Sequence, residues 1–191
     1  MSLPNKKKEG NDVIVAIDVD NLLISSAQGG QEYMGYSLIA GFHKMFAWIR
    51  TFGKILCVHL YLPPSQSTNS SLWHYLWEHY KNEFLIETIY CPPKKPVRPK
   101  EKPDNVDDHL IDHTKKIINL FGDQVRYFCL ASGDLDYSPL LWELRRKKGI
   151  EIAFSIGSES SFSKVYRQMQ IVAKHPETGE ELVYYFSPKK E

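Results

Sequence analysis

Pairs of carboxylates follow two apolar runs of the chain. Asp134 and Asp136 lie just after the run 125–130, and Asp18 and Asp20 follow the run 13–17. Carboxylates that share one pocket raise each other's pKa values, and a bound divalent cation removes that cost. Oxygen donors of this kind suit Mg²⁺ or Mn²⁺. The matching chemistry is phosphodiester hydrolysis, in which the metal generates a hydroxide nucleophile and stabilises charge on the scissile phosphate.

A third group of carboxylates opens a predicted helix over 106–121. The apolar residues of this helix form one stripe at helical spacing: Leu110, Ile111, Ile117, Ile118 and Phe121. At about 100° per residue, Asp107 points along the middle of the stripe, so it must be neutralised by a partner or belong to a site. Asp108 and Asp112 lie four residues apart on the flank, where simple solvent exposure is the competing interpretation.

Two histidines of the same helix have the spacing of a zinc-binding pair. His109 and His113 are four residues apart, so they share one face of the helix. The sequence near them offers no third soft ligand for zinc. We therefore interpret both as surface histidines.

Strands and helices alternate along the chain. Apolar runs predict strands at 13–17, 55–62, 85–90, 125–130 and 150–155, and helical spacing predicts helices at 36–51, 70–80, 106–121, 139–148 and 161–173. This alternation is typical of an α/β fold with a mostly parallel sheet, in which ligands bind at the carboxyl ends of the strands. Pro139 suits the first position of its helix, so Ser138 is the expected cap.

Length and composition indicate one globular domain. The chain has 191 residues, of which 42% are hydrophobic, and its net charge is only +1, so any surface for anions must be local. No apolar run is long enough to span a membrane. The three cysteines, Cys57, Cys91 and Cys129, lie in or at the end of apolar runs and are expected to be buried and reduced. These features favour the cytoplasm.

The two ends of the chain are expected to lie outside the main domain. Residues 1–11 read as a disordered basic tail, residues 12–174 as the domain, and residues 175–191 as a β-hairpin extension. The hairpin would either cover a sheet edge or build a homodimer, and the residues do not decide between the two.

A proline-rich loop at 91–103 concentrates positive charge. Its five prolines exclude a helix or a central strand, and its cationic residues are Lys94, Lys95, Arg98, Lys100 and Lys102. Such a loop could hold phosphates of a nucleic acid, although a solvated linker explains it equally well. Tyr33, Tyr36 and Trp73 are candidates for base stacking, and core packing is the better interpretation for Trp73.

At these residues the chain resembles the NYN domains of the PIN-like nuclease superfamily. The segment 18–21, Asp-Val-Asp-Asn, is similar to the family's Asp-x-x-Asn element. The segment 132–140, Ser-Gly-Asp-Leu-Asp-Tyr-Ser-Pro-Leu, resembles its motif Ser-Gly-Asp-x-Asp-Phe with a following Pro and apolar residue. Residues 147–152 resemble the segment that leads into the next strand. Asn105-Val106-Asp107 is similar to the family's Lys-Gly-Val-Asp, although Asp104 replaces the lysine, a role that Lys102 could take over.

The resemblance implies a three-layer α/β/α sandwich with a parallel five-stranded sheet in the order 3-2-1-4-5. It also implies ribonuclease chemistry that depends on Mg²⁺ or Mn²⁺ at Asp18, Asp107, Asp134 and Asp136, with RNA as the partner. Asn21 and Ser132 would orient ligands or substrate by hydrogen bonds.

Two other functions compete with this prediction. One is a nonenzymatic RNA-binding or adaptor protein on the same fold. The other is a phosphatase of the haloacid dehalogenase type, whose DxD motif would fit Asp18 and Asp20, although Ser138 occupies the position of its later acidic residue. A nucleotide-binding protein is excluded by the lack of a glycine-rich phosphate loop after the first strand.

Overall fold

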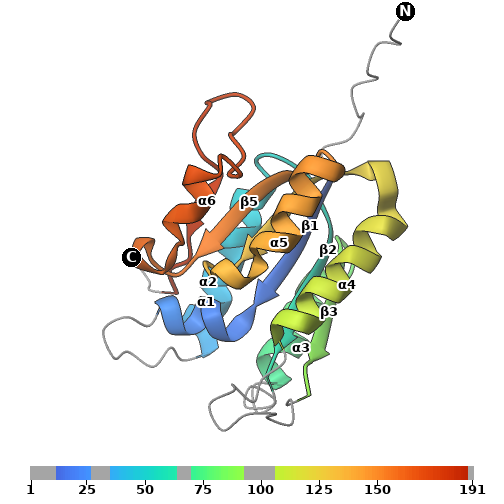
Figure 1. Ribbon diagram of the computed structural model, residues 1–191. Helices are drawn as coiled ribbons and strands as arrows, with labels where there is room; N and C mark the ends of the chain where they lie inside the picture. The colour runs from blue at the N-terminus through green and yellow to red at the C-terminus, as the bar shows by residue number, and fades with distance from the viewer. Residues whose placement is uncertain (1–11, 27–34, 64–69, 93–105, 189–191) are drawn as a thin grey trace, which may run out of the picture.

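The structure is a computed structural model that describes residues 12–26, 35–63, 70–92 and 106–188 (Figure 1). The predicted N-terminal tail, Tyr33 and Asp104 lie outside the described residues. The same is true of the cationic residues of the proline-rich loop, Lys94, Lys95, Arg98, Lys100 and Lys102.

Six parallel strands form one sheet in the order β3-β2-β1-β4-β5-β6. The strands are β1 (Asp12–Asp18), β2 (Lys54–Leu62), β3 (Leu85–Tyr90), β4 (Val125–Ala131), β5 (Glu151–Ile156) and β6 (Val183–Tyr185). The predicted order of five strands is confirmed, and β6 extends the sheet beyond β5. β1 occupies the middle because its apolar run is buried on both faces.

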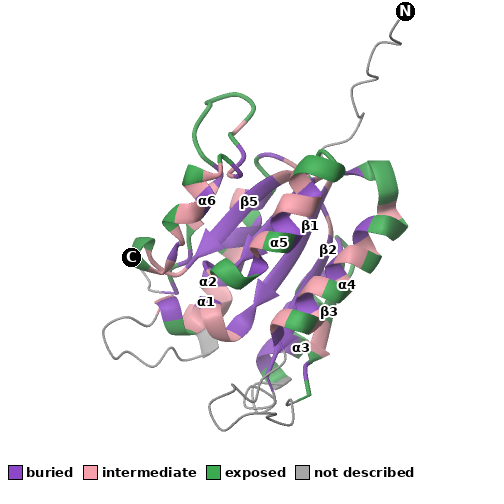
Figure 2. Ribbon diagram, viewed as in Figure 1, coloured by how far each residue is buried: buried purple, intermediate pink, exposed green. Residues whose placement is uncertain are grey.

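Helices cover both faces of the sheet, so the fold has three layers (Figures 1 and 2). One core cluster packs the sheet against α1 (Val19–Ser26), α2 (Gly35–Ile49) and α3 (Ser70–Tyr80). The other packs it against α4 (Val106–Phe121), α5 (Ser138–Trp142) and α6 (Lys164–Gln168). Residues of β1 alternate between the clusters, with Ile14 in one and Val15 in the other, as the period of two in a strand requires.

The strand order reverses between β1 and β4. From β1 the chain moves outward to β2 and β3, and from β4 it moves outward in the other direction to β5. In an open parallel sheet, the crevice outside the carboxyl ends of two such strands is the place where ligands bind. α4 begins at this same edge, because it follows the end of β3 and must run back before β4 starts. The topology therefore places Asp18, Asp107 and the segment after β4 at one edge.

The helix expected at 139–148 has a different form. The chain turns after β4 through a 3₁₀ helix (Leu135–Tyr137), continues as α5 and ends in a π-helical turn (Glu143–Lys147). Ser138 is the first residue of α5 and does not cap it, so that prediction is wrong. The side chain of Asp134 instead accepts a hydrogen bond from the backbone N–H of Asp136, which caps the earlier 3₁₀ turn.

The C-terminal part also departs from the sequence prediction. The helix expected at 161–173 is limited to α6, because Gln170 takes a left-handed conformation (φ 53°) and the next residues pair with the sheet. The N–H of Ala173 donates to the carbonyl of Ile152 at 2.7 Å. A hairpin turn follows, with an antiparallel bridge between Lys174 and Glu181. Its second arm then becomes β6, which pairs in parallel with β5 and so extends that side of the sheet.

Gly133 is required by a close approach of two backbones. A Cβ at this position would lie 2.1 Å from the carbonyl oxygen of Ser161 and 2.8 Å from its carbonyl carbon. We expect Gly133→Ala to lower the free energy of unfolding by about 3 kcal/mol, at the upper end of what overpacking costs. Gly122→Ala is the control, because its Cβ would meet no atom and only its positive φ of 55° opposes the change.

Denaturant unfolding of both variants measures the difference. A loss for Gly133→Ala that does not exceed the loss for Gly122→Ala would contradict this account of the backbone contact.

Candidate active site

Asp18 is a buried carboxylate at the end of the central strand. Only 6% of the residue is exposed. Its Oδ1 accepts a hydrogen bond from the backbone N–H of Asn21 at 3.1 Å, and its Oδ2 accepts one from the hydroxyl of Tyr137 at 2.8 Å. Burial raises the pKa of Asp18 from its ordinary value of 3.8 to about 6, and the charges of Asp107 and Asp20 act in the same direction. The two hydrogen bonds lower it only in part.

Tyr137 joins Asp18 to Asp107. Its hydroxyl lies 2.8 Å from Oδ2 of Asp18 and 2.6 Å from Oδ1 of Asp107, and its side chain is fully buried. One phenol proton cannot serve both carboxylates at the same time. The second short contact needs a proton on a carboxyl group, which the raised pKa of Asp18 supplies at acidic pH. Once both carboxylates are ionised, their charges repel each other, and a bound cation would offset that repulsion.

A hydrogen bond closes the crevice between β1 and β4. The side-chain oxygen of Asn21 accepts from the backbone N–H of Gly133 at 3.2 Å. Next to it, the fully buried Ser132 accepts from the backbone N–H of Asp134 at 3.2 Å. The Asn21 bond holds the segment after β4 against the end of β1, and the Ser132 bond fixes the turn within that segment.

Asp134 and Asp136 lie on the turn after β4. Asp134 is partly buried and Asp136 is exposed. The backbone carbonyl of Asp134 accepts a hydrogen bond from the hydroxyl of Tyr166, and both carboxylates raise the pKa of that tyrosine, although burial is the larger cause. The two aspartates therefore share the edge of the sheet with Asp18, but neither takes part in the bridge that Tyr137 makes.

The remaining sequence candidates lie around this pair. Asp20 is close enough to Asp18 to raise its pKa. Asp108 and Asp112 are exposed on α4. Trp73 is buried in the core, as expected from the sequence, and its ring packs edge-on against Phe42.

Tyr137 is the site residue that the sequence analysis missed. The only signal was its position: it occupies the place of a phenylalanine in the motif that the chain resembles, so its hydroxyl is the feature that needed an explanation.

Among Asp18, Asp107, Asp134 and Asp136, no three have carboxylate oxygens that all lie within 4.8 Å of one another. Among the described residues, one other cluster does meet this criterion. It consists of His59, Glu87 and His113, whose donor atoms all lie within 4.8 Å of one another. The interpretation of His113 as a surface histidine is therefore wrong. Its ring is in contact with His59 and its Nδ1 lies 2.9 Å from the hydroxyl of Tyr61.

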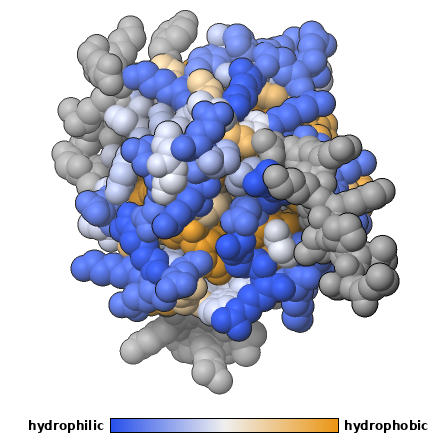
Figure 3. Space-filling view, turned by 90° about the horizontal axis from the view of Figure 1, so that it is seen from above, coloured by the Kyte–Doolittle hydropathy of each residue, from blue (hydrophilic) through white to orange (hydrophobic). Residues whose placement is uncertain are grey.

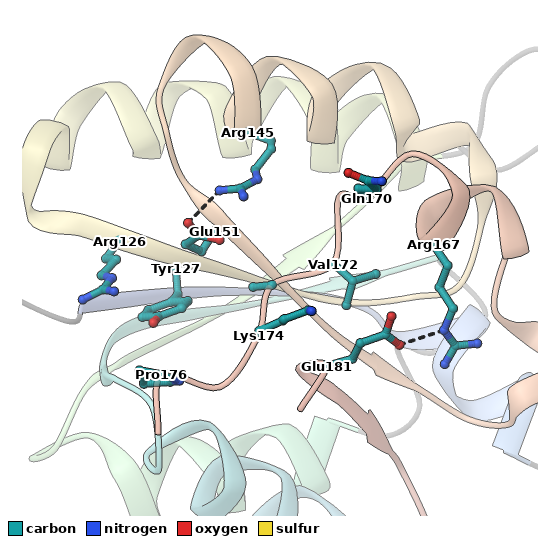
Figure 4. A pocket seen from close by; sticks show the side chains of 11 residues that line it. Arg126, Tyr127, Arg145, Glu151, Arg167, Gln170, Val172, Lys174, Pro176 and Glu181 are labelled. Atoms are coloured by element: carbon teal, nitrogen blue, oxygen red, sulfur yellow. Dashed lines mark hydrogen bonds and ion pairs between the residues drawn. The ribbon is translucent and has the colours of Figure 1, made fainter. Parts of the chain in front are cut away.

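A separate cavity of about 650 Å³ lies between the starts of β4 and β5 and the C-terminal hairpin (Figure 4). Four cationic side chains line it, and two of them are paired, Arg145 with Glu151 at 2.6 Å and Arg167 with Glu181 at 2.8 Å. Arg126 and Glu151 stand at the beginnings of their strands, so this cavity does not include the carboxyl edge. Seen from above, the molecule is mostly hydrophilic, with a hydrophobic area near the centre of the view (Figure 3).

The fold and the site together define a parallel α/β protein with an acidic site at its strand-order reversal. Residues 12–170 match the NYN domain family, and the chain belongs to it. NYN domains are generally nucleases, and this supports assigning the chain to the broad class of hydrolases.

One solved structure with the same fold is a protein of unknown function from Vibrio parahaemolyticus. It shares 15% sequence identity, with a TM-score of 0.60, over 85% of this chain and 91% of that one. At this identity the likeness shows the fold alone. The search of curated proteins found no match. Among the described helices, none has the length and apolar character needed to cross a membrane.

Replacing Asp18 by Asn should change how stability depends on pH. Because the pKa of Asp18 is about 6 in the folded protein and 3.8 ordinarily, the folded state holds the proton more tightly. The stability that this proton confers is complete below pH 4 and is lost as the pH rises through 6. Asp18→Asn lacks this loss, so in chelator it should be more stable than the native protein at pH 7, by up to about 3 kcal/mol, with a smaller difference near pH 4.

Urea unfolding across pH 4–7 measures this effect, with Asp12→Asn at the other end of β1 as the matched control. A difference between Asp18→Asn and the native protein that stays constant across this pH range would contradict the account.

The hydroxyl of Tyr137 should compete with a metal ion for the two carboxylates. A hydrogen bond to a charged group contributes about 1.5–3 kcal/mol, and an ion between Asp18 and Asp107 would have to replace it. We expect Tyr137→Phe to bind Mn²⁺ about 10-fold more tightly than the native protein, measured by titration calorimetry at pH 7.5. Tyr166→Phe is the control, since this hydroxyl donates to the backbone carbonyl of Asp134 rather than to the carboxylates of Asp18 and Asp107. An unchanged affinity would place the ion away from Asp18 and Asp107.

Proposed function

We propose that this protein is a ribonuclease that hydrolyses RNA phosphodiester bonds with the help of Mg²⁺ or Mn²⁺. The observation that carries the proposal is the bridge of Asp18, Tyr137 and Asp107 at the reversal of strand order in an NYN domain. Two carboxylates that both approach one phenol oxygen, at 2.8 and 2.6 Å, fit a cation with oxygen ligands. Asp134 and Asp136 on the adjoining turn complete the proposed metal-binding and catalytic set.

The bound metal would supply a hydroxide nucleophile and stabilise negative charge on the scissile phosphate. Asp18 and Asp107 would hold the ion in a partly buried place, where burial strengthens the attraction between opposite charges. Asp136, which is exposed, and its neighbour Asp134 would face the substrate side of the site. Asn21 and Ser132 position this turn through their hydrogen bonds to the backbone of Gly133 and Asp134.

The remaining parts of the proposal concern the substrate and its surroundings. The cationic loop with Lys94, Lys95, Arg98, Lys100 and Lys102 would contact the phosphates of RNA on either side of the cleaved bond. Asp20, Asp108 and Asp112 are further candidates for this acidic rim. We place the activity in the cytoplasm and leave open whether a homodimer forms. The family match gives no support to the haloacid dehalogenase alternative.

An RNA cleavage assay tests this function. The native chain should cleave single-stranded or structured RNA in Mn²⁺ or Mg²⁺ and lose the activity in chelator. Asp107→Asn and Asp134→Asn should each lower the rate by about 100-fold or more, because each removes a group that stabilises charge in the transition state. Asp12→Asn, at the opposite end of β1 from Asp18, should keep the native rate.

Two outcomes would contradict the proposal. Cleavage that persists unchanged in both site variants would come from a contaminant. RNA binding without cleavage in either metal would instead support the nonenzymatic adaptor.

A further inference from the structure

His59 is a buried histidine with an unexplained nitrogen. It lies in the middle of β2, its side chain is 2% exposed, and its Nε2 has no hydrogen-bond partner among the described residues. A buried polar atom that is left without a partner costs free energy, and most such atoms in folded proteins are paired. This nitrogen is therefore open to a ligand, provided that neighbouring side chains supply further donors.

Two further donors converge on His59 from neighbouring elements. Glu87 is its direct neighbour on the edge strand β3, and the Oε2 of Glu87 lies 3.5 Å from the Nε2 of His59. His113 comes from α4, and its ring centroid lies 4.8 Å from that of His59. Donor atoms of all three residues lie within 4.8 Å of one another. Three separate elements thus each bring one metal-binding side chain to the same point.

Burial acts on the two imidazoles of this cluster in the same direction. Burial, with a smaller effect from His113, lowers the pKa of His59 to about 4, and burial also lowers the pKa of His113. A lowered pKa favours the neutral imidazole, which is the form that binds metals.

Tyr61 contacts the ring of His113 at its other nitrogen, Nδ1. Its buried hydroxyl lies 2.9 Å from Nδ1 of His113. When Nδ1–H donates to this oxygen, the lone pair of Nε2 is available for coordination. Histidines that bind metals usually donate their other ring N–H to such an outer partner, which fixes the orientation of the ring.

We propose that His59, Glu87 and His113 form a zinc-binding site that is separate from the aspartates. In a tetrahedral zinc site with bonds of about 2.0–2.1 Å, two ligand atoms stand about 3.4 Å apart, and the 3.5 Å between His59 and Glu87 matches this spacing. Two imidazoles and one carboxylate are a known type of zinc ligand set, with the fourth position left to water.

The site differs from the aspartate site in place and in chemistry. His113 follows Asp107 by six residues on α4, which is about 9 Å along the helix axis. Imidazole donors favour Zn²⁺, whereas carboxylates favour Mg²⁺ and Mn²⁺. The carboxylate of Glu87 is about half exposed, so an ion can reach the site from solvent. A bound zinc ion would tie the edge strand β3 to β2 and α4, and this proposal does not depend on ribonuclease activity.

Zinc titration of the full, chelator-stripped chain tests the site. Glu87→Gln keeps the shape of an exposed side chain, and His113→Ala removes a partly exposed ligand, while His74→Ala on the surface of α3 is the matched control. We expect both site variants to bind Zn²⁺ at least about 100-fold more weakly, since even the loss of an outer partner costs 10–100-fold. His74→Ala and Asp18→Asn should keep the native affinity for zinc.

Two further readouts separate this site from the aspartates. Zinc should raise the Tm of the native chain and of His74→Ala, but not that of Glu87→Gln. Binding of Mn²⁺ should be the same in Glu87→Gln and in the native chain. The proposal is overturned if the native chain does not bind zinc, if Glu87→Gln binds it as tightly as the native chain, or if Asp18→Asn is the variant that loses it.

Discussion

The burial of Asp18 at the end of the central strand is the constraint around which the carboxyl edge is organised. β1 must be apolar and covered on both faces to occupy the middle of the sheet, so the residue that ends it is carried into the interior with its charge. Neighbouring groups donate hydrogen bonds to this carboxylate. The backbone of Asn21 and the hydroxyl of Tyr137 donate to its two oxygens, while Asp107 approaches the same hydroxyl from α4.

Much of this arrangement follows from the sequence. Continuous apolar runs identified the five main strands, and the alternation with helices indicated parallel pairing, which alone brings Asp18 and the segment after β4 to one edge. The stripe of α4 indicated that Asp107 faces the sheet, because helical spacing fixes the direction of a side chain once the apolar face is known. In the structure Asp107 contacts Tyr137 next to Asp18. Periodicity and topology were sufficient for these features.

Features that depend on a contact between distant residues could not be derived in this way. Ser138 had the local chemistry of a cap, but a 3₁₀ turn capped by Asp134 precedes α5 and displaces the cap by several residues. Tyr137 stands where the family motif has a phenylalanine, and only the fold shows that its hydroxyl lies between two carboxylates. The sequence predicted a hairpin at 175–191, but the parallel pairing of β6 with β5 depends on where the hairpin returns the chain.

α4 links the two donor sets of the molecule. Asp107 in its first turn reaches the hydroxyl of Tyr137, and His113 at the start of its third turn reaches His59 and Tyr61. A helix is stiff over this distance, so its position along the sheet sets both contacts together. A zinc ion on His113 would tie α4 to β2 and β3, whereas the hydroxyl of Tyr137 holds Asp107 next to Asp18. The two donor sets therefore share one helix, but each is held by its own contacts and can bind its ion independently of the other.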